Sequence, residues 1–205
     1  SLDENVGRLV KALKDKGLYD NTVIVYTSDH GCHFKTRNAE YKRSCHDSSI
    51  HTPLVFGGGA VDKGEIMNCL VSLIDIPPTL LSLAEIEIPK VYSGNILPVN
   101  RQDAPERDCV FIQISESQVG RAVRTKDWKY SAKALGPGNI KHSAIVYFDD
   151  FLYDLKNDPS ERHNLVNDKE YLDALRKMRE LLAREMVKAG EKKPIFYKPL
   201  KAKSF

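Results

Sequence analysis

Apolar residues at the start of the chain recur at the spacing of one helical face: Leu2, Val6, Leu9, Val10 and Leu13. Acidic residues in the first turn and lysines in the last turn suit the helix dipole. Gly17 then supplies a residue at which helices commonly end. The pattern predicts an amphipathic helix over residues 2–16, joined by a short turn to a strand.

Residues 23–27 are a run of β-branched and aromatic side chains, which is typical of a strand buried on both faces. Asp29, His30 and Gly31 follow directly. Charged and ligating groups at the end of a buried strand cost free energy unless something there requires them. In open α/β sheets, ligands bind beyond the carboxyl ends of the strands. Asp29 and His30 are therefore candidate metal or substrate ligands; alternatively, Asp29 caps the turn and His30 is a satisfied core histidine.

Residues 32–49 are polar and contain almost nothing that forms a core, so they predict a long loop over a crevice. The loop combines four cations with nearby histidines. Cations that face an acid-bound metal make a site for a phosphate or sulfate group. A solvated basic loop is the alternative. The residues concerned are Lys35, Arg37, Lys42, Arg43, His33, His46 and His51.

The rest of the chain predicts short strands over residues 50–57 and 68–73, then a helix capped by Asp75 with Pro77 and Pro78 in its first turn. A shift to Pro, Asn, Asp and Arg after residue 91 predicts a boundary, which we place between domains 1–100 and 101–205. The second domain predicts a small antiparallel sheet under a final helix capped by Asn167. Its strands span residues 109–114, 120–124, 128–132 and 145–153. The fold class is α/β, and the tail from Gly190 is expected along the surface or frayed.

Composition reduces the number of functional classes that the chain could belong to. The net charge of +3 is too small, and the basic residues too scattered, to indicate nucleic acid. No apolar run reaches the length of a membrane span, and no secretory leader is visible. None of the four cysteines forms a C-x-x-C pair. A zinc site built from Cys32, His33, Cys45 and His46 fits no usual spacing, and a Cys32–Cys45 disulfide stays open.

Four segments resemble type I sulfatases of the alkaline phosphatase superfamily. Residues 20–31 (DNTVIVYTSDHG) resemble the family's DNT-strand-TSDHG segment, and residues 42–53 (KRSCHDSSIHTP) its K-x-x-x-Y-E-G-G-I-R-V-P element. Residues 71–81 (VSLIDIPPTLL) resemble its S-x-x-D-x-x-P-T-L-L helix. Residues 152–165 resemble its LYDL-x-x-DP-x-E-x-x-NL signature. The four occur in the family's order across most of the chain.

The resemblance implies the carboxy-terminal part of an alkaline-phosphatase-like α/β sandwich, followed by a small antiparallel sheet packed with a helix. It implies that Asp29 is a metal ligand and that His30 completes the coordination or holds the substrate. It makes Lys42 a catalytic and substrate-binding residue that stabilises charge on the sulfate group. A divalent metal, usually calcium in such enzymes, would draw charge off the sulfate oxygens.

The chain also departs from the family pattern. His46 stands where the family often has tyrosine, serines replace the glycine pair, and His51 replaces an arginine. We expect His46 and His51 to shape a substrate subsite, as for a sugar. Histidines satisfied by backbone carbonyls are the alternative for His33, His46 and His51.

The family's nucleophile, a formylglycine made in a C/S-x-P-x-R motif, has no counterpart in these 205 residues. We therefore expect a carboxy-terminal half, separated by cleavage, truncation or assembly from separate chains, and inactive by itself. Its partners would be the amino-terminal half and a sulfated small molecule or saccharide. Family habit implies an exported or lysosomal protein.

Two further hypotheses stay open. A phosphodiesterase or phosphonate hydrolase of the same superfamily would use a further histidine in the loop, His46 or His51. A binding module without catalysis would lack the C/S-x-P-x-R motif altogether. An authentic start codon at Ser1 would favour the module.

Overall fold

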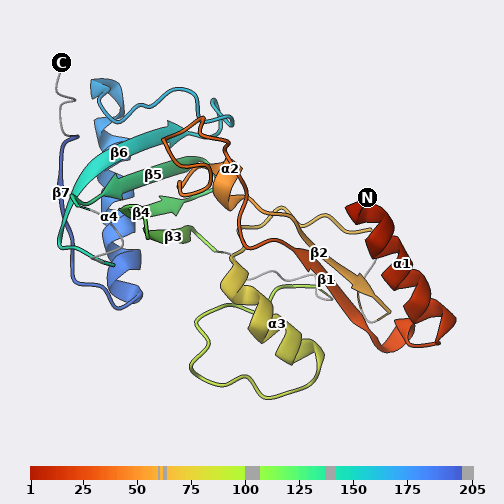
Figure 1. The fold of residues 1–205 in the computed structure, drawn as a ribbon. Helices are drawn as coiled ribbons and strands as arrows, with labels where there is room; N and C mark the ends of the chain where they lie inside the picture. The colour runs from red at the N-terminus through yellow and green to blue at the C-terminus, as the bar shows by residue number, and fades with distance from the viewer. Residues whose placement is uncertain (60, 62–63, 100–106, 137–141, 200–205) are drawn as a thin grey trace. The chain divides into compact units, whose positions relative to one another are not determined.

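The computed structural model describes residues 1–59, 61, 64–99, 107–136 and 142–199, and the chain forms two compact units. The first unit comprises residues 1–29 and 52–106, and the second comprises residues 30–51 and 107–205 (Figure 1). The second boundary falls close to the predicted position at residue 100. The predicted domains differ from these units in one respect, because residues 30–51 lie with the second unit.

The first unit begins with α1 (Leu2–Asp15), whose start is fixed by a capping box between Ser1 and Glu4. A short 3₁₀ turn, η1 (Tyr19–Asn21), leads into β1 (Val23–Thr27). β1 pairs with β2 (Leu54–Gly58) in an antiparallel two-stranded sheet. The helix and both strands confirm the elements predicted from the apolar pattern.

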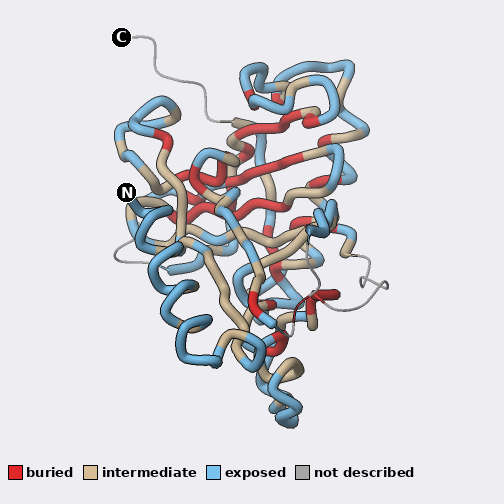
Figure 2. Tube along the Cα trace, turned by 90° about the vertical axis from the view of Figure 1, so that its right-hand side faces the viewer, coloured by how far each residue is buried: buried red, intermediate tan, exposed pale blue. Residues whose placement is uncertain are grey.

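Burial in the first unit is lower than the sequence predicted. β1 is half-buried along most of its length, not enclosed on both faces, and α1 has no buried residue (Figure 2). The main buried cluster is small: Val61, Leu97 and Val99, with Val23, Leu54, Phe56 and Val71 packed against it. A two-stranded sheet has few neighbours to cover it, so β-branched composition alone overestimated its burial.

Two further predictions for this unit need correction. Residues 68–73 form no strand; they lead into η2 (Leu73–Asp75) and then α3 (Ile76–Leu83). Asp75 precedes α3 as predicted, with proline in the first turn, but its side chain does not cap that helix. The fully buried carboxylate accepts hydrogen bonds from the backbone N–H groups of Ser72 (2.7 Å) and Asn95 (2.8 Å). It therefore ties the loop that follows α3 to the start of the helix.

The second unit contains a five-stranded sheet in the order β3-β4-β5-β6-β7. The first four strands are antiparallel and consecutive: β3 (Val110–Ser115), β4 (Val119–Arg124), β5 (Trp128–Lys133) and β6 (Val146–Asp154). They confirm the predicted antiparallel sheet to within two residues at each end. The fifth strand, β7 (Ile195–Tyr197), was not predicted; it comes from the tail and runs parallel to β6.

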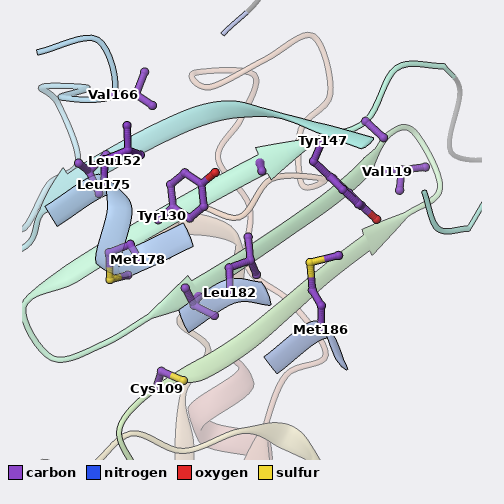
Figure 3. Packing of buried hydrophobic residues seen from close by; sticks show 13 residues of the cluster. Cys109, Val119, Tyr130, Tyr147, Leu152, Val166, Leu175, Met178, Leu182 and Met186 are labelled. Carbon is purple, nitrogen blue, oxygen red and sulfur yellow. The ribbon is translucent and has the colours of Figure 1, made fainter. Parts of the chain in front are cut away.

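The final helix, α4 (Leu172–Lys188), packs on one face of this sheet (Figure 1). A 3₁₀ turn, η3 (Lys169–Tyr171), precedes it, and its cap is Asp168, not the predicted Asn167. The predicted apolar stripe is confirmed. Between helix and sheet, Tyr130 and Leu152 meet α4 side chains (Figure 3), among which Leu175, Met178, Leu182 and Met186 are buried.

The opposite face of the sheet carries a second cluster. Alternation along the strands places Ala122, Phe151 and Tyr153 there, whereas Val123 and Leu152 face α4. Cys45, from the segment 30–51, completes this second cluster. The sheet is thus covered by α4 on one face and by residues 30–51 on the other, and α2 (Asp47–Ile50) ends that segment. Within the described chain, no helix has the length and apolar character needed to cross a bilayer.

Candidate active site

The segment 30–51 is folded into a closed loop by its own backbone. Gly31 N–H donates to the Ser49 carbonyl (2.7 Å), and His33 N–H donates to the Tyr41 carbonyl (2.8 Å). A Cβ on Gly31 would lie 2.3 Å from the Ser48 carbonyl oxygen, so only glycine permits this closure. The glycine of the TSDHG segment therefore has a steric role at the mouth of the loop.

Lys42 and His30 are brought together by this closure. The Lys42 Nζ lies 2.8 Å from the His30 Nε2, and the His30 Nδ1 lies 2.7 Å from the Gly31 carbonyl oxygen. A carbonyl only accepts, so Nδ1 carries the proton and Nε2 has the lone pair that the Lys42 ammonium meets. The two predicted site residues therefore form one hydrogen-bonded pair, in which Lys42 Nζ meets His30 Nε2.

A second interaction fixes the neighbour of Lys42. Arg43 Nε donates to Glu116 (2.7 Å), its Nη2 reaches the other Glu116 oxygen, and its Nη1 donates to Glu40 (2.8 Å). The two carboxylates raise the pKa of Arg43, and Arg43 in turn lowers the pKa of Glu116. A bidentate pair of this kind has one preferred geometry, so it holds the backbone beside Lys42 against the β3–β4 turn.

Asp29 belongs to the first unit and follows β1 at an exposed position. Its Oδ1 accepts a hydrogen bond from the Ser28 hydroxyl at 3.5 Å. His51, at the end of α2, is exposed and donates its backbone N–H to the Asp47 carbonyl (2.8 Å). Both side chains are on the surface of the described chain.

His46 lies deeper than a subsite residue at a pocket rim. It is buried against Phe151 and Tyr153, with its Nε2 3.1 Å from the Tyr153 hydroxyl and its Nδ1 paired with the Ser44 hydroxyl. Burial, aided by the positive charges of Arg37 and Lys129, lowers its pKa to about 3. His46 is therefore neutral at physiological pH and packs residues 30–51 onto the sheet.

A polar pocket of about 280 Å³ lies beside His46 within the second unit. Its lining includes charged, amide, hydroxyl and imidazole groups: Arg37, Asn38, Lys133, Asp150, Ser44, His46, Ser131 and Tyr153. Arg37 and Asn38 are engaged with backbone carbonyls, and Lys133 is paired with Asp150 (2.6 Å). The polar groups are thus held in place by the protein itself.

The structure bears on two alternatives considered from the sequence, a Cys32–Cys45 disulfide and a zinc site. All four cysteines are free thiols, so Cys32 and Cys45 form no disulfide. Burial raises the pKa of the Cys45 thiol to about 12. Among the described residues, Cys32, His33, Cys45 and His46 do not gather into a cluster that could hold a metal ion. Neither ring nitrogen of the buried His33 has a hydrogen-bond partner, so His33 is not satisfied by a carbonyl.

The donor set fits a divalent metal in part. Asp29 offers a carboxylate, which suits a hard cation, and neutral His30 offers a nitrogen lone pair. Among the described residues, no three His, Cys, Asp or Glu side chains gather as a metal cluster. Two ligands are fewer than the four to eight that metals take in proteins. Further ligands are needed to complete a shell.

The sequence did not single out three residues that organise this site. Glu116 pairs with Arg43, Lys129 pairs with Asp47, and Glu161 pairs with Lys129. All three partners lie more than 30 residues away along the chain, so no local pattern reveals them. One sequence signal existed: Glu161 belongs to the LYDL…DP-x-E signature. That glutamate was given no role from the sequence alone.

The two units have the architecture of the carboxy-terminal part of alkaline-phosphatase-like α/β proteins. A 2-O GAG sulfatase structure matches 92% of this chain and 41% of its own, with a TM-score of 0.77 and 27% identity. A protein solved in complex with its substrate D-glucosamine-2-N,6-O-disulfate matches 94% of this chain and 39% of its own, with a TM-score of 0.73 and 27% identity. A phosphonate monoester hydrolase from Silicibacter pomeroyi, 21% identical, shares the fold (TM-score 0.73) over 91% of this chain and 38% of its own.

Sequence comparison agrees. The family model described as Sulfatase matches residues 1–86. Arylsulfatase K from Gallus gallus is 32% identical over 176 residues, which cover 80% of this chain and 31% of the relative. The chain is thus similar to sulfatases over most of its length, and residues 1–86 carry the match to the family model. It spans about a third of the length of the curated relatives that it matches.

Proposed function

We propose that the intact protein hydrolyses sulfate esters and that Lys42 binds the sulfate group and stabilises the charge that develops on it. The observation that supports this role is the Lys42–His30 pair, which holds an ammonium group at a defined point of the loop. A positive charge held in place before reaction costs no reorganisation when charge develops. Similarity to sulfatases supplies the reaction class.

In the chain without a metal, His30 Nε2 accepts a hydrogen bond from Lys42. We further propose that Asp29 and His30, consecutive in the chain, contribute ligands to a divalent metal, for which calcium is the family expectation. When bound, such a metal polarises the sulfate oxygens. A formylglycine nucleophile is expected in polypeptide outside these 205 residues.

A sulfated saccharide is the substrate class that we favour. Two structural neighbours support it: a 2-O GAG sulfatase and a protein solved with its substrate D-glucosamine-2-N,6-O-disulfate. The polar pocket that His46 helps to line suits sugar hydroxyls, so we retain His46 as a proposed subsite residue. The exposed His51 stays a second proposed subsite residue. An exported or lysosomal location follows family habit and is proposed on that ground alone.

The deciding experiment measures hydrolysis by the intact protein of a sulfated monosaccharide, a phosphate diester and a phosphonate monoester. We expect the sulfate ester to be preferred. Lys42→Ala is expected to lower kcat by about 10²–10³, the usual effect of removing one charge-stabilising group. Lys35→Ala, on an exposed lysine of the same loop, is the matched control and should leave kcat unchanged.

Two outcomes contradict the proposal. Preference for the phosphorus esters would assign the protein to the phosphohydrolase branch of the fold. Absence of turnover on all three substrates, with a folded protein that still binds sulfated sugar, would favour a binding module.

A further inference from the structure

Glu161 has contacts that reach well beyond the turn in which it lies. Its side chain is almost fully buried, and its backbone adopts a φ of +56°, a left-handed conformation that is unusual for a residue other than glycine. One carboxylate oxygen accepts a hydrogen bond from the backbone N–H of Asp47 (2.9 Å), and the other pairs with Lys129. Its carbonyl oxygen accepts from Arg37 Nη1.

The buried charges around Glu161 balance. Lys129, fully buried on β5, bonds both Glu161 and Asp47, and Arg124 on β4 lies 3.4 Å from the same Asp47 oxygen. Burial works to raise the pKa of Asp47, but Lys129 and Arg124 outweigh it, so the pKa is lowered and Asp47 stays ionised. Two cations therefore meet two carboxylates. Removing one partner from such a buried set leaves an uncompensated charge, which is strongly unfavourable.

These contacts attach residues 30–51 to the rest of the second unit on both sides of Lys42. Arg37 lies five residues before Lys42 and donates to the carbonyl oxygens of Ser160 (2.7 Å) and Glu161. Asp47 lies five residues after Lys42 and is held by the Glu161 carboxylate and by Lys129. Both attachments converge on Glu161, whereas the Lys42 side chain is hydrogen-bonded to His30.

The neighbouring residues of the LYDL-x-x-DP-x-E-x-x-NL signature make contacts of a different kind from those of Glu161. Asp158 accepts the backbone N–H groups of Arg162 and His163 (both 2.7 Å), which closes the turn. Asn164 accepts the backbone N–H of Leu152 (3.1 Å), which anchors the turn to β6. The Glu161 side chain makes no such contact within its own turn. Its geometry is therefore not explained by the turn alone.

We propose that Glu161 is a positioning residue that fixes the segment carrying Lys42. Its carboxylate and carbonyl hold Asp47 and Arg37, and this fixes the place of the Lys42 ammonium relative to the sulfate group. The inference deepens the proposed function and depends on it for its catalytic consequence. It assigns a mechanical role to the glutamate of the DP-x-E signature.

The first test is independent of catalysis. Hydrogen exchange is measured on the 205-residue chain for wild type, for Glu161→Gln, and for Glu170→Gln as a control on an exposed glutamate. Glu161→Gln keeps an oxygen for the Asp47 N–H but loses the charge that pairs with Lys129. We expect exchange at the amides of Gly31, His33 and Ser49 to accelerate by about tenfold or more, and by more than any change in β6 and α4, which form no hydrogen bond with Glu161 among the described residues. Unchanged exchange in the loop would overturn the proposal.

The second test measures kcat and KM of the intact protein on a sulfated monosaccharide. Glu161→Gln is expected to lower kcat by about 10²-fold, the loss typical of a catalytic group displaced by about 1 Å, with a smaller change in KM. In a Lys42→Ala background, Glu161→Gln should cost little more, because both changes act through one side chain. Multiplicative losses would instead show an effect of Glu161 that bypasses Lys42, and would overturn the proposal.

A third variant covers the case in which Glu161→Gln fails to fold. Arg37→Gln removes the other attachment without leaving a buried charge, and it should give the same loop-specific exchange and the same non-additivity with Lys42→Ala. If Lys42→Ala itself leaves sulfate hydrolysis intact, the proposed function fails. The hydrogen-exchange comparison still decides whether Glu161 fixes the loop.

Discussion

The hydrogen bond between Lys42 and His30 shows how one residue sets the protonation of another. His30 accepts through Nε2 because its Nδ1 proton is directed at the Gly31 carbonyl. The same lone pair is the only one through which neutral His30 could bind a metal. A metal at His30 would therefore compete with the Lys42 ammonium for Nε2, which links metal binding to the position of the lysine.

Calcium binding tests the proposed ligand role of Asp29. In the intact protein, Asp29→Asn removes one negative charge from the proposed shell, and we expect calcium affinity by titration calorimetry to fall by at least about tenfold. Asp127→Asn, at an exposed aspartate, is the matched control. Equal calcium affinity in wild type and Asp29→Asn would remove Asp29 from the metal site.

His46 makes the stability of the chain depend on pH. Its pKa is lowered from 6.5 to about 3 in the folded state, so the unfolded chain binds a proton that the folded chain does not. The free energy of unfolding should therefore decrease as the pH falls from about 6.5 to about 3. Urea unfolding of wild type and His46→Gln at several pH values isolates this contribution.

The difference between the two proteins is the informative quantity, because other groups titrate equally in both. Wild type should lose stability relative to His46→Gln steadily below pH 6.5. A difference that is independent of pH between 6.5 and 4 would show that His46 takes up its proton as readily in the folded protein as in the unfolded chain. That result would contradict its burial against Tyr153.

At the scale of elements, α4 and the sheet supply most of the packing. Leu182 is fully buried against the strands, whereas Leu172 on the same helix is 54% exposed. Leu182→Ala is expected to lower the free energy of unfolding by about 2–5 kcal/mol, because it leaves a cavity. Leu172→Ala should change it by less than about 0.5 kcal/mol. Similar effects of the two changes in urea unfolding would contradict the observed packing of α4.

Elements with local signals were predicted well. α1, α4 and strands β3 to β6 follow from apolar period and turn residues, which act over a few positions. β7 was missed because it is three residues long and gains its place only by pairing with β6. The role of Asp75 was missed for the same reason, since its partner Asn95 lies 20 residues away.

The same contrast between local sequence signals and long-range partners applies to the candidate site. Lys42 and His30 were predicted as site residues through family segments, and their contact needed the closure of the loop by Gly31. The burial of His46 depends on Tyr153, 107 residues further along the chain. A histidine in a polar stretch gives no local indication of such a partner. Long-range pairing, not composition, decides which loop side chains reach solvent.

At the scale of the whole molecule, the two units differ in how their backbones are protected. The second unit has a sheet covered on both faces, while α1 of the first unit has no buried residue (Figure 2). A 14-residue helix without packing is marginally stable in water. Native-state hydrogen exchange on the 205-residue chain should therefore show strong protection in β4, β5, β6 and α4 and weak protection in α1.

Denaturant dependence sharpens this expectation. Amides of β4, β5, β6 and α4 should exchange only through unfolding of the whole sheet, so their exchange should accelerate with urea. Amides of α1 should exchange by local fraying and be insensitive to urea. Protection of α1 equal to that of β5 would mean that its apolar residues, Leu2 and Leu9 among them, are covered in solution. That result would contradict the burial described here, because exposed apolar side chains give a helix no packing energy with which to resist opening.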